Sequence, residues 1–269
     1  MKKRRKNRRK AGCLFFIILM VIAIIFSVSK CGKRNDTAPT KKQSHYNSSD
    51  INAMITDFAK KHNLQADEYP ERLVEMLKKN PETKDFVLNY PLNKGKNYKI
   101  DLSDAKNGKN VPLFLQWDER WGYYQYAGDL MGLTGCGPTC LSMVSVYLLK
   151  DDKYTPKYIA RFAETNGYSV IGNGSSWNLI SEGGKRLGLD VTEIPLNESR
   201  IIRNLEAGNP IICIMGAGDF TSTGHFIVMT DYVDGKIKVN DPNSKIRSKK
   251  IWELDDIKYQ IKNLRVCRK

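Results

Sequence analysis

The segment GLTGCGPTC, residues 132–140, places a cysteine where its sulfur could act as a nucleophile. Cys136 lies between Gly135 and Gly137, and Pro138 precedes the apolar run TCLSMVSVYLLK. The apolar residues of that run recur at steps of three and four, which predicts an amphipathic helix, and Pro138 suits its first turn. Free backbone N–H groups and the positive end of a helix dipole favour a thiolate. We therefore interpret Cys136 as a reactive cysteine on a pliable glycine loop just before a helix.

A cysteine nucleophile needs a base, a group that orients the base, and donors for the oxyanion. The chain has three histidines, and two of them, His45 and His62, precede the region that contains Cys136. His225 is therefore the candidate base, at the start of the strand-like run HFIVMTDY. A lone histidine at a strand start is also often a satisfied edge residue, and that interpretation stays open from the residue alone.

Asp241 is the predicted partner of His225, and its placement depends on the register of a hairpin. The run HFIVMTDYVDGKIKVNDP indicates two strands joined at Asp234-Gly235. After a two-residue turn Asp241 would face away from His225, whereas a three-residue turn would place both on one face as diagonal neighbours. Asp231 is a weaker candidate, because six residues along one strand span about 20 Å. Choosing Asp241 implies the three-residue turn.

The oxyanion of such a reaction also needs hydrogen-bond donors. The backbone N–H of Cys136 is one donor, and a side-chain amide is a common second one. Gln116, in LFLQWDERW, is our candidate for the amide, against the simpler interpretation of a polar loop residue. Gln125 is the weaker choice.

Cys140 and a group of aromatic residues near the nucleophile can each be interpreted in two ways. Cys140 lies four residues after Cys136, a spacing that does not suit a metal pair, so we expect core packing, with a redox pair as the alternative. Five aromatic residues could line a substrate groove or pack against the helix: Trp117, Trp121, Tyr123, Tyr124 and Tyr126.

The elements that would position these residues indicate an α+β domain, because helices come first and strands last. We expect it to open with a strand and an aromatic loop at VPLFLQWDERWGYYQY. After the Cys136 helix, further helices are expected near residues 156–165, 175–189 and 198–208. Strands are expected at LDVTEI, NPIICIMG, HFIVMTDY and KIKVND, forming an antiparallel sheet.

Composition divides the chain into four parts. Residues 1–29 are a basic tail and an apolar run, and residues 30–49 are a polar, flexible stalk with little to bury. Residues 50–110 form a small helical prefix and linker, with Ser49 or Asp50 as the expected first cap and helices opened by Pro70 and Pro81. Residues 111–269 form the main domain, on which the short prefix helices are expected to pack.

The net charge of +15 is concentrated at the N-terminus. Without the 13 basic residues and one acid of segments 1–10 and 30–42, the chain has 31 basic and 28 acidic residues, which does not indicate nucleic acid as a partner. The apolar run 11–29 carries no charge, and 19 residues span roughly the 30 Å of a bilayer core. Eight preceding cations would keep the N-terminus in the cytoplasm and place the rest outside. We favour a membrane anchor, with a cleaved signal peptide as the alternative.

The segments VPLFLQWDERWGYYQY, GLTGCGPTCLSMV and GHFIVMTDYVDGKIKVNDP together resemble cysteine peptidase family thirty-nine. These are papain-like peptidases akin to the double-glycine leader peptidases that process bacteriocins. The resemblance covers roughly residues 111–245. It implies Cys136 as nucleophile, His225 as general base, Asp241 as the residue that orients the imidazole, and Gln116 as oxyanion donor. Two departures are evident: the glutamine lies twenty residues before the cysteine, and no ATP-binding cassette follows.

The sequence therefore predicts an exported, membrane-tethered cysteine peptidase with a papain-like α+β fold, helices packed against a C-terminal antiparallel sheet. Its partners would be a peptide or protein substrate and the membrane, and it needs no metal or cofactor. If the N-terminal segment is cleaved, the protein would be secreted. The alternatives are a non-catalytic module that binds peptides or cell-wall material on the same fold, and a peptidoglycan amide hydrolase.

Overall fold

The computed structural model describes residues 46–269, which belong to one compact unit that begins at His45. The predicted anchor, 11–29, lies outside the described residues, as does most of the predicted stalk, 30–49. Across the described part of the chain, no helix combines the length and the apolar character that crossing a bilayer requires.

The prefix is helical, as the sequence predicts, and its first helix begins slightly earlier than expected. Its helices are α2 (Ser48–His62), α3 (Glu71–Lys79), α4 (Lys84–Leu88) and α5 (Tyr90–Asn93), with 3₁₀ turns at Ala66–Glu68 and Pro81–Thr83. The cap of α2 is Asn47, not Ser49 or Asp50. The Asn47 side chain accepts from the Asp50 N–H, and the Asp50 side chain accepts from the Asn47 N–H, a capping box.

The prefix packs on the domain that follows, which confirms that expectation. One apolar cluster joins Leu73, Leu77 and Phe86 of the prefix to Leu115 and Trp117 of the main domain. All five side chains are less than a tenth exposed. Short helices of this kind cannot form a core by themselves, so the prefix depends on this shared burial for its stability.

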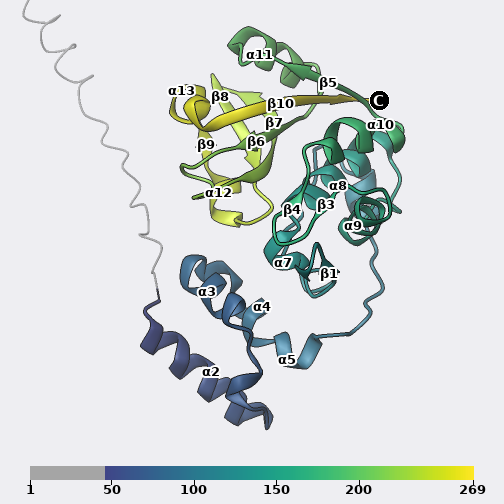
Figure 1. Cartoon of the computed structure of the whole chain (residues 1–269). Helices are drawn as coiled ribbons and strands as arrows, with labels where there is room; N and C mark the ends of the chain where they lie inside the picture. Colours follow the sequence, from purple (N-terminus) through teal and green to yellow (C-terminus); the bar gives the residue numbers. More distant parts are fainter. Residues whose placement is uncertain (1–45) are drawn as a thin grey trace, which may run out of the picture. The chain divides into compact units, whose positions relative to one another are not determined.

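Helices form one part of the main domain (Figure 1). This part includes α7 (Met131–Thr134), α8 (Cys136–Leu149), α9 (Pro156–Thr165), and α10 (Gly184–Arg186), which a π-helical turn at Leu179–Gly183 precedes. The helix α6 (Ser103–Asn107) precedes them in the linker. The expected helix at 156–165 is confirmed, and the one at 175–189 is reduced to the π turn and α10. The expected opening strand does not form, because residues 111–115 have an irregular backbone.

The helix α8 begins at Cys136 itself, and it is not amphipathic. Residues 137–146 are all buried, since α8 packs against strand β7 on one side and against α9 and α6 on others. Covering on several sides explains why the expected polar face is missing.

A six-stranded antiparallel sheet forms the C-terminal part, as predicted. Its order is β5 (Asp190–Ile194), β10 (Ile261–Arg268), β6 (Ile211–Met215), β7 (His225–Val233), β8 (Lys236–Asn240) and β9 (Ile251–Trp252). The short pairs β1 (Gln125–Tyr126) with β2 (Asp129–Leu130), and β3 (Ser169–Val170) with β4 (Gly174–Ser175), lie outside it. The sequence did not predict β10, which lies between β5 and β6.

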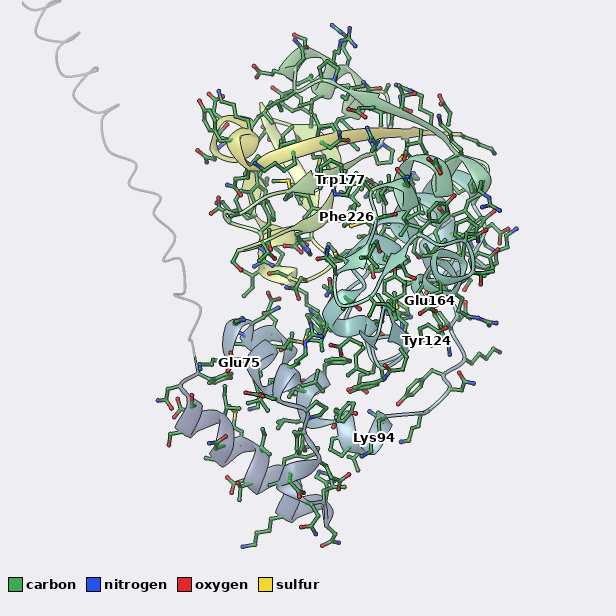
Figure 2. All side chains as sticks on the ribbon, in the orientation of Figure 1. Glu75, Lys94, Tyr124, Glu164, Trp177 and Phe226 are labelled. Carbon is green, nitrogen blue, oxygen red and sulfur yellow. The ribbon has the colours of Figure 1, made fainter. Side chains whose placement is uncertain are left out.

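Strand β7 divides two cores. Phe226 and Val228 face the cluster that includes α8 (Phe226 is labelled in Figure 2), whereas Ile227 and Met229 face the opposite cluster. The second cluster is covered by α11 (Glu198–Glu206) and α13 (Leu254–Ile257). Alternate residues of a strand point to opposite faces, so successive residues of β7 belong to different clusters.

The hairpin of β7 and β8 places Asp241 through a bulge and not through the expected three-residue turn. Asp234 and Gly235 both have positive φ, 53° and 80°, and form a two-residue turn between Val233 and Lys236. The register then shifts by one residue between Met229 and Asp231, so that position 228 pairs with 240. The shift brings position 241 opposite 227, the register that the three-residue turn would have produced.

The two glycines around Cys136 serve close packing, which corrects the expectation of a pliable loop. Gly135 and Gly137 both lack a positive φ. A Cβ on Gly135 would lie 2.5 Å from the Met131 carbonyl oxygen, and a Cβ on Gly137 would lie 2.7 Å from Ser175 Oγ. Glycine therefore lets the start of α8 approach its neighbours, and Cys136 is fixed in position.

Replacing Gly137 by alanine is expected to lower the free energy of unfolding by about 1–3 kcal/mol, because the added Cβ overpacks against Ser175. Urea unfolding measures the change. Gly224→Ala is the matched control, since a Cβ there meets no atom within 4 Å. Equal stability of the Gly137→Ala variant and the wild type would contradict the close contact.

Candidate active site

A cleft with a volume of about 630 Å³ opens beside Cys136. Three of the predicted residues line it, Gln116, Cys136 and His225, together with the loop 218–224. The prefix forms another wall through Arg72, Lys79 and Asn80. A ligand that reaches the sulfur would therefore contact both the main domain and the prefix.

Cys136 is the first residue of α8, and its side chain is partly exposed. Burial raises the pKa of the Cys136 thiol, but the hydrogen bond and charge of His225 oppose this effect. The backbone N–H groups of Phe226 and Gly137 also donate to the sulfur, and the net result is a pKa below that of an ordinary thiol. The geometry thus favours the thiolate that the sequence predicts.

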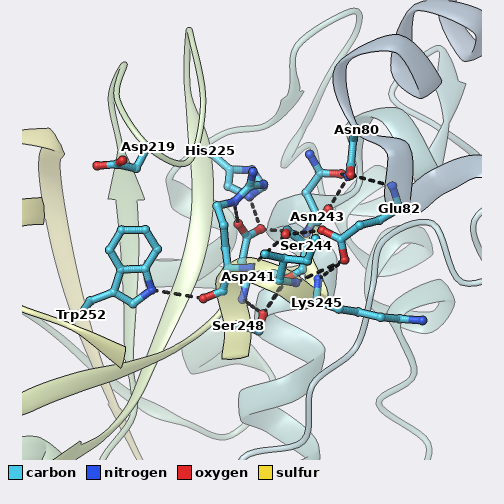
Figure 3. Close-up of polar contacts among 12 residues, drawn as sticks. Asn80, Glu82, Asp219, His225, Asp241, Asn243, Ser244, Lys245, Ser248 and Trp252 are labelled. Atoms are coloured by element: carbon cyan, nitrogen blue, oxygen red, sulfur yellow. Dashed lines mark hydrogen bonds and ion pairs between the residues drawn. The ribbon is translucent and has the colours of Figure 1, made fainter. Parts of the chain in front are cut away.

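His225 is buried at the start of β7, and its ring lies beside Asp241 (Figure 3). Cys136 is its other side-chain partner. His225 Nε2 lies 2.8 Å from Asp241 Oδ1. A carboxylate only accepts hydrogen bonds, so Nε2 carries the proton and Nδ1 is left for the thiol. Burial lowers the pKa of His225, but the Asp241 carboxylate and the Cys136 sulfur outweigh it and raise the pKa to about 10. An imidazolium is therefore stabilised beside the thiolate.

Asp241 is fully buried. Besides the bond to His225, Oδ1 accepts from the backbone N–H of Asn243 at 2.7 Å and Oδ2 accepts from Nε of Arg247. Burial raises the pKa of Asp241, whereas His225 and Arg247 lower it, and the net shift is downward. The carboxylate accordingly stays ionised at neutral pH.

Gln116 lines the cleft, and its backbone is hydrogen-bonded to the loop that contains Asp241. Its backbone N–H donates to the Pro242 carbonyl at 2.7 Å. Its Nε2 donates one hydrogen to the Gly132 carbonyl at 2.8 Å, which leaves a second hydrogen on the same atom. The side chain is only 4% exposed and lines the same cleft as Cys136.

The weaker candidates do not join the site. Gln125 lies in β1 and lines a different cavity, and the Asp231 side chain is 44% exposed and pairs with Lys238. Cys140 is fully buried in the core, and burial raises the pKa of its thiol. These placements agree with core packing for Cys140.

Four of the five aromatic residues are buried, as the packing interpretation expects. Trp117, Trp121, Tyr123 and Tyr126 are buried, and none of the five lines the cleft beside Cys136. Tyr124 lies near α9, where its hydroxyl donates to Glu164 (both labelled in Figure 2).

Sequence reasoning missed two neighbours of Asp241, namely Asn243 and Arg247. Both follow Asp241 within six residues, in the run NDPNSKIR. Such a run of Asn, Asp, Pro and Ser is typical of a turn whose backbone N–H groups bind a nearby carboxylate, and this signal could have found Asn243. Arg247 had no comparable signal. In the described range 46–269, no group of three His, Cys, Asp or Glu side chains is arranged to bind a metal ion.

Comparison with known proteins gives one family match. Residues 108–265 match the model of a family described as the Peptidase C39 like family. No match was found among curated proteins.

Solved structures that are similar to this chain include a peptidase domain and a putative peptidase. The peptidase domain of Streptococcus ComA, a bifunctional ABC transporter involved in a quorum sensing pathway, is 16% identical with a TM-score of 0.42, covering 59% of this chain and 98% of that one. A putative C39-like peptidase from Bacillus anthracis is 14% identical with a TM-score of 0.38, covering 60% of this chain and 96% of that one.

The lowered pKa of Cys136 predicts how its alkylation by iodoacetamide depends on pH. The alkylation rate of an ordinary thiol rises with pH and has its midpoint at the thiol's pKa of about 8.5. The rate at Cys136 is expected to reach its plateau at a lower pH. Mass spectrometry of peptides measures each cysteine separately, and Cys140, Cys213 and Cys267 are internal controls because burial raises their pKa values. A Cys136 profile centred at the ordinary value would contradict the ion pair.

Proposed function

Because the chain belongs to the Peptidase C39 like family, we propose that it is a cysteine peptidase that hydrolyses peptide bonds with Cys136 as nucleophile. One observation carries the proposal. His225 Nε2 lies 2.8 Å from Asp241 Oδ1 in a buried hydrogen bond, and the same imidazole is a hydrogen-bond partner of the Cys136 sulfur. A histidine that served only as an edge residue would not need a buried carboxylate and a thiol on its two nitrogens.

The mechanism follows from these positions. The Cys136 thiolate attacks the carbonyl carbon of the scissile bond, and the C=O electron pair moves to oxygen. When the tetrahedral intermediate collapses, the C–N bond breaks and His225 gives its proton to the leaving amine. Water then attacks the thioester while His225 takes a proton from it, and the acid product leaves as the thiolate forms again.

Two donors would stabilise the oxyanion. The backbone N–H of Cys136 is available, because the first residue of a helix has no acceptor within that helix. The second hydrogen of Gln116 Nε2 is the other donor. Such donors act strongly where water is excluded, and losing one typically costs about a hundredfold or more in rate.

We also propose, from the sequence alone, that the enzyme is held at the membrane with its peptidase domain outside the cell. The uncharged run 11–29 behind a basic tail would anchor the chain and place the peptidase domain outside the cell. Cleavage after that run would give a secreted enzyme instead.

Asp241→Asn is expected to lower the rate of peptide hydrolysis by roughly a hundredfold, because the amide no longer stabilises the imidazolium. The assay incubates the full-length protein with a mixture of peptides and follows new termini by mass spectrometry. Asp231→Asn is the matched control, since Asp231 is on the same strand as His225 but its side chain is 44% exposed.

Other outcomes of this assay identify the alternatives. Cleavage of a muropeptide mixture without cleavage of peptides would replace the peptidase with a peptidoglycan amide hydrolase. Binding of peptides by the wild type without turnover, unchanged in the Cys136→Ala variant, would indicate a non-catalytic module.

A further inference from the structure

We infer that the helical prefix is part of the catalytic apparatus, and that Glu82 is the positioning residue through which it sets the place of Asp241. The inference rests on the proposed peptidase function and adds to it a residue outside the segment that matches the family, 108–265. Glu82 lies in the 3₁₀ turn between α3 and α4.

The Glu82 carboxylate binds the loop that follows Asp241 (Figure 3). Its Oε1 accepts from the Ser244 hydroxyl. Its Oε2 accepts from the backbone N–H groups of Lys245 at 2.8 Å and Ile246 at 3.2 Å. These donors belong to the residues at the start of α12 (Lys245–Lys249), so one carboxylate of the prefix fixes where that helix begins.

The start of α12 in turn fixes Asp241. Arg247, on the first turn of α12, donates from Nε to Asp241 Oδ2. The Ser248 hydroxyl accepts from the Asp241 backbone N–H at 2.9 Å. A shift of α12 therefore moves two groups that contact Asp241, one on its side chain and one on its backbone.

Asn80 provides a second connection from the prefix. Its Nδ2 donates to the Asn243 carbonyl at 2.6 Å, and the Asn243 N–H donates to Asp241 Oδ1 at 2.7 Å. Its Oδ1 accepts from the Glu82 N–H at 3.1 Å, so Asn80 also orders the turn that carries Glu82. Two side chains of the prefix thus converge on residues 243–246.

A substitution at Glu82 tests positioning without changing the wall of the cleft, whereas a substitution at Asn80 would change both. Asn80 lines the cleft beside Cys136, whereas Glu82 does not line it. A change at Glu82 should therefore act through Asp241 and His225 alone. If the loop loosens, the carboxylate stabilises the imidazolium less, the thiolate loses its partner, and the pKa of Cys136 rises.

The test compares Glu82→Gln with the wild type in the full-length protein. The amide keeps the size of the side chain but presents only one accepting atom to three donors. We expect the midpoint of the pH profile for iodoacetamide alkylation of Cys136 to rise by about one unit, a tenfold loss at acidic pH. With any peptide that the wild type cleaves, kcat should fall about tenfold while KM changes less than about twofold.

Glu68→Gln is the matched control. Glu68 is also a prefix carboxylate with hydrogen-bonded partners, Lys94 and the Gln65 N–H, and all of these lie within the prefix or its linker. Its variant should retain the wild-type profile. Ser244→Ala removes one of the three donors to Glu82, and it also removes the Ser244 cap on the Arg247 N–H. The double variant with Glu82→Gln therefore measures the part of its effect that acts through Glu82. If Glu82→Gln does not fold, a wild-type profile in Ser244→Ala overturns the inference.

The outcomes distinguish a failure of the Glu82 role from a failure of the proposed peptidase function. If Cys136 of the wild type shows the profile of an ordinary thiol, the proposed peptidase mechanism fails. If Cys136 of the wild type is activated and the profiles of Glu82→Gln and Ser244→Ala coincide with it, the inference alone is overturned. An unchanged profile with a raised KM would mean that the prefix acts only as a wall of the cleft.

Discussion

The buried hydrogen bond between Asp241 and His225 is the constraint on which the rest of the site depends. A fully buried carboxylate is costly unless donors surround it. Here the donors are His225 Nε2, the Asn243 N–H and Arg247 Nε. Each comes from a different local structure, so strand, turn and helix must all be correctly placed before the charge is tolerated.

The same charges connect the site to stability. The pKa of His225 is raised in the folded protein, so its contribution is complete below the unfolded value of about 6.5 and declines as the pH rises through the folded value of about 10. The pKa of Asp241 is lowered, so its contribution is complete above the unfolded value and declines only as the pH falls through the lower folded value. Between mild acid and neutral pH both contributions to stability are present.

Local patterns predicted which residues lie at the site better than they predicted the backbone geometry that places them there. Cys136 and His225 could be chosen from residue type and position, because the main domain offers few thiols and a single histidine. The predicted register of Asp241 was correct, but a bulge near Thr230 produces it and not the expected three-residue turn. Bulges leave little trace in a sequence. Strand β10 was missed because its run IKNLRVCR mixes Lys and Arg with apolar residues, and its pairing with β5 and β6 is non-local.

Local sequence patterns could not predict that the prefix contacts the loop after Asp241. Glu82 is one acid among 29, and its partners in the chain lie more than 160 positions away. Only the folded arrangement, in which α3 and α4 pack on Leu115 and Trp117, brings the turn between them to the loop after Asp241. Apolar burial thus supplies the affinity of the prefix for the domain, and the polar contacts of Asn80 and Glu82 supply its orientation. A peptidase domain whose orienting carboxylate is braced from outside the family segment would couple its activity to the docking of that prefix.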